Sequence, residues 1–189
     1  MVLTLSTMLP LQHTATDFNL LDVMIQENVS LNGFKGTKGT KGTKGNLVVF
    51  ICNHSPFIIH LLEHFNLLAD KLKPQGITTI AISSNDIDNY PQDGPNKCKL
   101  FVRNTKYLFP IYITLRKKSQ RLMMRLVRLN FTYLMTKIMG YRGGYDPSRP
   151  QSGRPITGEY LKNATLNLIN KKPISKNQFP SMGCSIKWK

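Results

Sequence analysis

The chain has 189 residues, with 26 Lys and Arg residues against 10 Asp and Glu residues, and a formal net charge of +16. That length suits one domain with a substantial core, and a hydrophobic content of 41% argues against wholesale disorder. No apolar run approaches the roughly 20 residues that span a bilayer, and the start lacks the basic and apolar regions of a secretory signal. We therefore expect a single domain over residues 1–189, located in the cytoplasm.

The first third of the chain has β character at residues 17–22 and 27–31. Residues 33–45 contain the triplet Gly-Thr-Lys three times in succession. A phosphate-binding loop needs Gly-Lys followed by Ser or Thr, whereas here Thr precedes Lys, so the motif is not matched. The composition instead predicts a flexible loop between two strands.

A continuous apolar, β-branched run at residues 46–52 predicts a central strand covered on both faces. The turn that follows contains Ser55, which can cap a helix, and Pro56, which suits the first turn of a helix over residues 57–72. Residues 77–83 repeat the buried-strand pattern. Strand, helix and strand in this order predict a parallel crossover, and hence an α/β fold.

The second half of the chain is harder to assign. Pro95 can open a second helix, and residues 156–170 predict a terminal helix capped by Thr157. A Pro-containing tail follows at residues 171–189. Between these helices, residues 106–140 form an atypical basic segment.

The basic residues are concentrated in one stretch of the chain. Between Asp93 and Asp146 there are twelve Lys and Arg residues and no acidic residue. Residues 115–129 can form a basic amphipathic helix, which could lie on RNA, on an anionic membrane or against an acidic protein. One interpretation of residues 97–142 is therefore a non-catalytic binding module.

Cys52 lies where a strand leads into a helix N-terminus. The helix dipole and free N–H groups at such a position lower the pKa of a thiol, and the thiolate attacks disulfides and peroxides. A buried core cysteine is the equally weighted alternative. His54, His60 and His64 lie close by in sequence and suggest zinc, but the spacing from Cys52 is too tight for the usual structural sites. We therefore expect no metal site.

Residues 47–57, Leu-Val-Val-Phe-Ile-Cys-Asn-His-Ser-Pro-Phe, resemble the strand and active-site turn of peroxiredoxin-like thioredoxin-fold proteins of the alkyl hydroperoxide reductase and thiol-specific antioxidant type. In that family the turn reads Cys-Asn-His-Cys-Pro-Phe. Further segments share the resemblance, namely residues 81–86, 90–93, 141–143, 146, 148–150, 155–158 and 183–189.

The resemblance implies a thioredoxin-like α/β fold with a central mixed sheet, and a thiol-disulfide oxidoreductase of the antioxidant type. It implies protein or peroxide substrates and a thiol reductant, with no cofactor and no nucleic acid. The site residues that it implies are Cys52, His54, Ser55 and Pro56.

Two departures from the family pattern put the activity of this chain in doubt. Ser55 stands where the family has the second cysteine, and a hydroxyl there cannot form the disulfide. Cys98 and Cys184 remain as distant candidates for a resolving thiol. The Cys-Thr-Pro loop of the family is also missing, so we expect impaired catalysis.

The second departure has a coding explanation. Synonymous codons can be chosen for residues 115–129 so that one nucleotide added in front of them shifts the reading frame to a family-like sequence. The shifted triplets then translate as Thr-Gln-Lys-Lys-Val-Ala-Lys-Ala-Tyr-Asp-Ala-Ala-Cys-Thr-Pro. This recovers the missing Cys-Thr-Pro and indicates that residues 106–140 are read in a shifted frame. We then expect residues 111–140 to be irregular or helical, without the central strand that the family has there.

Overall fold

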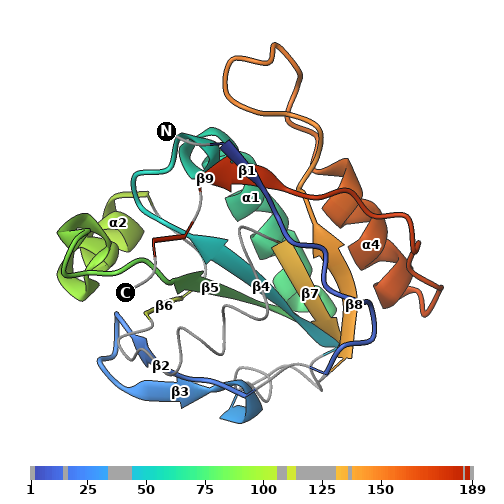
Figure 1. The fold of residues 1–189 in the computed structure, drawn as a ribbon. Helices are drawn as coiled ribbons and strands as arrows, with labels where there is room; N and C mark the ends of the chain where they lie inside the picture. Colours follow the sequence, from blue (N-terminus) through green and yellow to red (C-terminus); the bar gives the residue numbers. More distant parts are fainter. Residues whose placement is uncertain are drawn as a thin grey trace.

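The structure is a computed structural model that describes residues 3–14, 17–33, 44–105, 110–113, 131–135, 138–184 and 186–187 (Figure 1). The strands are β1 (Leu3–Leu5), β2 (Asn19–Asp22), β3 (Asn28–Ser30), β4 (Gly45–Ile51), β5 (Ile77–Ser83), β6 (Ile111–Ile113), β7 (Phe131–Met135), β8 (Ile138–Gly143) and β9 (Met182–Cys184). The helices are α1 (Pro56–Leu72), α2 (Pro95–Thr105) and α4 (Glu159–Ile169), with 3-10 turns at Leu31–Gly33, Lys73–Gln75 and Pro91–Asp93.

Over these residues the strands form a seven-stranded mixed sheet in the order β3-β2-β6-β5-β4-β7-β8, and a separate two-stranded sheet of β1 and β9. The unit β4–α1–β5 lies at its centre, and β4 and β5 pair in parallel from Gly45↔Ile77 to Ile51↔Ser83. This confirms the predicted strand–helix–strand unit and the α/β class. Cys52 follows directly at the carboxyl end of β4.

The sheet is buried on both faces, as the apolar run of β4 predicts. Leu47 and Val49 belong to one core cluster, whereas Val48 and Phe50 belong to the other. Because successive strand residues point to opposite faces, a continuous apolar run is what such a strand needs.

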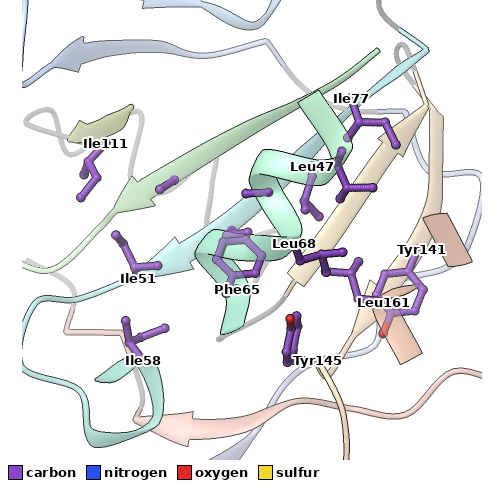
Figure 2. Close-up of a cluster of buried hydrophobic side chains, with 14 of the residues drawn as sticks. Leu47, Ile51, Ile58, Phe65, Leu68, Ile77, Ile111, Tyr141, Tyr145 and Leu161 are labelled. Carbon is purple, nitrogen blue, oxygen red and sulfur yellow. The ribbon is translucent and has the colours of Figure 1, made fainter. Parts of the chain in front are cut away.

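Helices α1, α2 and α4 contribute to the same cluster, so they cover one face of the sheet. Figure 2 shows the part of this cluster that α1 and α4 supply. Phe65 and Leu68 of α1 and Leu161 of α4 pack there around Tyr145. Full burial of one such side chain contributes about 1.5–3 kcal/mol. This core holds the amino end of α1 against the end of β4.

The expectation of an irregular or helical middle segment is wrong for its described residues. β6 pairs in parallel with β5, and β7 pairs antiparallel with both β4 and β8. Phe131-Thr-Tyr-Leu-Met135 is rich in aromatic and β-branched residues, which favour a strand, and the free edge of β4 offers it hydrogen-bonding partners. Residues 106–109, 114–130 and 136–137, including the expected basic helix, lie outside the described residues, as do residues 34–43 of the Gly-Thr-Lys loop.

The entry to α4 also differs from the sequence prediction. The helix begins at Glu159 after Gly158, whose φ of 66° is left-handed and therefore suits glycine. Oδ2 of Asp146 accepts the backbone N–H groups of Thr157 and Gly158, each at 2.7 Å. Asp146 therefore holds the chain where it enters α4.

Among the helices of the described ranges, none combines the length and apolar character that a membrane crossing requires.

Candidate functional site

The turn between β4 and α1 is closed by local hydrogen bonds. The N–H of Ser55 donates to the carbonyl of Cys52 at 3.4 Å, and the N–H of Ile59 donates to the carbonyl of Ser55 at 3.0 Å. Ser55 occupies the N-cap position of α1, but its side chain makes no capping hydrogen bond. Its buried hydroxyl lies instead 3.6 Å from Sγ of Cys184.

Cys52 is buried, with only 8% of the residue exposed, and this burial has the largest effect on the pKa of its thiol. Desolvation by burial, followed by the electrostatic influence of Asp93 and Cys184, raises the pKa of the thiol to about 12. The backbone N–H groups of Ser55 and His54 act in the opposite direction but do not compensate. The expectation of a lowered pKa at this helix N-terminus is therefore wrong, because the cost of burying a thiolate exceeds the favourable backbone interactions.

Asp93 joins the site from the loop after β5, although sequence reasoning gave it no role. It is fully buried, and its Oδ1 accepts the backbone N–H of Asn53 at 2.9 Å. Its Oδ2 accepts a hydrogen bond from Nδ2 of Asn85 at 2.8 Å and lies 3.4 Å from Nδ1 of His54. The signal that could have identified Asp93 is its place in Tyr90-Pro-Gln-Asp93, a segment that shares the family resemblance.

His54 is the exposed member of this group. Its side chain is 39% exposed, and its ring is stacked parallel to that of Tyr90, with centroids 6.5 Å apart. Single ligand atoms of Cys52, His54 and Asp93 lie within 4.8 Å of one another. Pro56, also named from the sequence, is exposed at the first position of α1.

The two remaining cysteines both lie near the turn, but in different settings. Cys98 is fully buried; its Sγ accepts Nδ2 of Asn53 at 3.3 Å and donates to the carbonyl of Asp93 at 3.3 Å. Burial raises the pKa of the Cys98 thiol to about 11. Cys184 is half-buried at the end of β9 and faces the Ser55 hydroxyl. None of these three cysteines, all within the described residues, forms a disulfide.

His60 and His64 belong to a different cluster and do not join Cys52. Nε2 of His60 lies 3.3 Å from the Ser148 hydroxyl, and Nδ1 of His64 lies 2.5 Å from the Tyr145 hydroxyl. Burial, and then the charge of Lys162, lower the pKa of His64. His60, Tyr145 and Ser148 line a pocket of about 250 Å³ that also reaches Met182 in β9.

No family model matches the chain, and no curated protein matches it. Several solved structures, in contrast, match the chain. An uncharacterized conserved protein from Geobacillus kaustophilus is 33% identical, with a TM-score of 0.91 over 100% of this chain and 97% of that one. A hypothetical protein from Sinorhizobium meliloti 1021 is 28% identical, with a TM-score of 0.88 over 98% of each chain.

More distant structures share the fold alone. The thioredoxin domain of a thiol-disulfide oxidoreductase from Bacteroides vulgatus is 17% identical, with a TM-score of 0.55 over 72% of this chain and 91% of that one. The mixed α/β sheet, with Cys52 between its central strand and α1, agrees with this likeness. The chain belongs to the family of the uncharacterized conserved protein from Geobacillus kaustophilus, and its fold is thioredoxin-like.

Proposed function

We propose that this protein is a thiol-disulfide oxidoreductase in which Cys52 and Cys184 form the redox pair. The observation that carries this proposal is the 3.6 Å distance between Sγ of Cys184 and the hydroxyl of Ser55. Cys184 thus lies beside the turn position where the resembling family has its second cysteine. The contribution of Cys184 to the raised pKa of Cys52 also supports a short distance between the two thiols.

The exposure of the two thiols suggests the order of the reaction. Cys184 is half-buried and Cys52 is buried, so a disulfide substrate meets Cys184 first. The Cys184 thiolate attacks one sulfur of the substrate, forms a mixed disulfide and releases one thiolate. Cys52 then loses its proton to solvent and attacks the Cys184 sulfur, which releases the second thiolate and leaves a Cys52–Cys184 disulfide. Two electrons pass from the pair to the substrate.

We expect this activity to be weak. The raised pKa of Cys52 makes its thiolate scarce at neutral pH, and Ser55 replaces a thiol with a poor nucleophile. The antioxidant type of activity, in which a peroxide replaces the disulfide substrate, is a finer proposal on the same pair. It needs a thiol reductant to return the pair to the dithiol form, and the reducing cytoplasm is the compartment that we propose.

A glutathione titration tests the pairing. The reduced chain is equilibrated with oxidised and reduced glutathione, the free thiols are alkylated, and mass spectrometry identifies the disulfides. We expect a Cys52–Cys184 disulfide in the unaltered chain and in Cys98→Ser, which serves as the matched control. Cys184→Ser should give only a mixed glutathione adduct. A Cys52–Cys98 disulfide, or no intramolecular disulfide at all, would contradict the proposal.

We also infer that the basic segment arises from a shifted reading frame and is not a binding surface. The charge is confined to the stretch where the resemblance stops, and the regrouped codons recover Cys-Thr-Pro. The strand β7 does not distinguish the two reading frames. Residues 131–135 favour a strand as they stand, and suitable codons for residues 130–137, regrouped in the same way, can read Lys-Phe-Tyr-Leu-Phe, which also favours a strand. The nucleotide sequence around codons 106–141 tests the inference. RNA binding with a steep salt dependence would support the binding-module alternative instead.

A further inference from the structure

We propose that Cys52, His54 and Asp93 form a binding site for a zinc-type divalent cation. The argument begins with distance, since one ligand atom from each residue lies within 4.8 Å of the others. Zinc bonds of about 2.0–2.3 Å in a tetrahedral arrangement place neighbouring ligand atoms roughly 3.3–3.8 Å apart. Nδ1 of His54 and Oδ2 of Asp93 are already 3.4 Å apart. Binding must therefore draw the other ligand atoms, which lie at most 4.8 Å apart, closer together.

The chemistry of the three ligands selects the type of cation. A thiolate, an imidazole and a carboxylate together suit zinc and its neighbours in the first transition row, whereas calcium and magnesium require oxygen ligands. Three protein ligands leave one tetrahedral position open, which is the arrangement of zinc sites that bind water or a substrate atom. When the cation binds, the Cys52 thiol releases its proton to solvent and the sulfur donates an electron pair to the metal.

The residues around the cluster orient its ligands in advance. The Asp93 carboxylate is buried and held by the backbone N–H of Asn53 and by Nδ2 of Asn85. The ring of His54 is stacked against Tyr90. Outer contacts of this kind fix the geometry of metal ligands, and their removal typically costs about 10–100-fold in affinity. A buried carboxylate whose Oδ2 lies 3.4 Å from Nδ1 of His54 also gives a cation a favourable electrostatic environment.

A metal at this site and the redox pair compete, because both use the Cys52 sulfur. The site nevertheless goes beyond the proposed function, since Cys184 belongs to the redox pair and not to the ligand set. The variant Cys184→Ser should therefore abolish the redox pair and leave cation binding intact, which distinguishes the two proposals.

Cobalt(II) is the probe, because a cobalt–thiolate bond gives a charge-transfer absorption band in the near ultraviolet. The reduced full chain, freed of metal with EDTA and then exchanged into chelator-free buffer, is titrated with Co²⁺, and Zn²⁺ is then added to displace it. We expect one equivalent of Co²⁺ to produce the band and Zn²⁺ to abolish it.

Variants identify the ligands. His54→Ala should weaken Co²⁺ binding by about 100-fold or more, because loss of a ligand exceeds the loss of an outer contact. His60→Ala is the matched control, since its ring contacts Ser148 and not the cluster. Cys52→Ser should remove the band, and Cys184→Ser should keep it. His54 is exposed, so its truncation leaves the core intact, which circular dichroism verifies. A missing band in the unaltered chain, equal affinity for His54→Ala and His60→Ala, or loss of the band in Cys184→Ser would overturn the site.

Discussion

At the scale of single residues, burial and not helix position dominates the pKa of the Cys52 thiol. The folded chain raises the pKa of this thiol from 9.0 to about 12 and so retains its proton more tightly than the unfolded chain does. We therefore expect iodoacetamide to alkylate Cys184 before Cys52 at pH 7, with EDTA present to exclude metal. Peptide mapping of the alkylated sites measures both rates.

The pH dependence of Cys52 has a definite sign. A group whose pKa is raised by folding stabilises the folded state fully below its unfolded pKa, and this contribution is lost as pH rises toward the folded value. Cys52 should therefore contribute stability that declines between about pH 9 and about pH 12. Urea titrations of the unaltered chain and Cys52→Ser should show a difference in the free energy of unfolding that shrinks across this range.

In the alkylation experiment, faster modification of Cys52 than of Cys184 at pH 7 would contradict the argument that burial suppresses the Cys52 thiolate.

At the scale of secondary-structure elements, Asp146 fixes the amino end of α4. Its carboxylate accepts the N–H groups of Thr157 and Gly158 and the N–H and hydroxyl of Ser148, and these bonds lower its pKa despite burial. Asp146→Ala should lower the free energy of unfolding by about 2–3 kcal/mol, because several backbone donors lose their acceptor. Urea denaturation measures the change.

The control for Asp146 is Asp70→Ala, which removes an exposed carboxylate on α1 and should change stability by less than about 0.5 kcal/mol. The pH profile provides a further check. Because folding lowers the pKa of Asp146, its contribution is present above the unfolded pKa and is lost as pH falls through the folded value. An equal loss in Asp146→Ala at neutral and at strongly acidic pH would contradict this assignment.

The pairing of β1 with β9 places Cys184. The register runs from Leu3↔Cys184 to Leu5↔Met182, and Ser6 extends it, since its N–H donates to the Ser181 carbonyl and its hydroxyl accepts the Ser181 N–H. Ser6→Ala leaves that buried N–H without its acceptor, which should cost about 1–3 kcal/mol.

Loosening β9 in this way should also move Cys184 from the turn. We expect Ser6→Ala to need a more oxidising glutathione ratio than the unaltered chain to form half of the Cys52–Cys184 disulfide. Thr157→Ala is a suitable control, because Thr157 lies at the entry to α4 and not in this sheet. An unchanged midpoint for Ser6→Ala, with the expected loss of stability, would show that β1 does not position Cys184.

The same elements show how far the sequence predicts the molecule. The β4–α1–β5 unit was predicted because its apolar periodicity and its turn residues are local signals. The proximity of Cys184 to Ser55 was not, because it depends on a pairing between strands near opposite ends of the chain. The pKa of Cys52 was predicted in the wrong direction, since sequence shows its helix position but not its burial.

At the scale of the whole molecule, the uneven distribution of charge is the feature that the fold does not require. Twelve of the 26 Lys and Arg residues lie between Asp93 and Asp146, without an acidic residue to balance them. Crowding of like charges opposes compaction, whereas a typical surface mixes both signs. The strands β6 and β7 of this stretch are paired in the central sheet, so the case for a shifted reading frame rests on the charge distribution and not on a lost strand.

The last prediction concerns the chain with its frame restored. A one-base insertion near codon 107 and a compensating deletion near codon 140 should lower the net charge and place Cys-Thr-Pro at positions 127–129. If the segment is read in an accidentally shifted frame, as we propose, the restored chain should be more stable, and each kcal/mol gained should raise the melting temperature by about 2–4 °C. Calorimetry of the two chains at one salt concentration measures the difference. A lower melting temperature for the restored chain, or an in-frame segment in genomic DNA together with salt-sensitive RNA binding, would instead favour a selected basic surface.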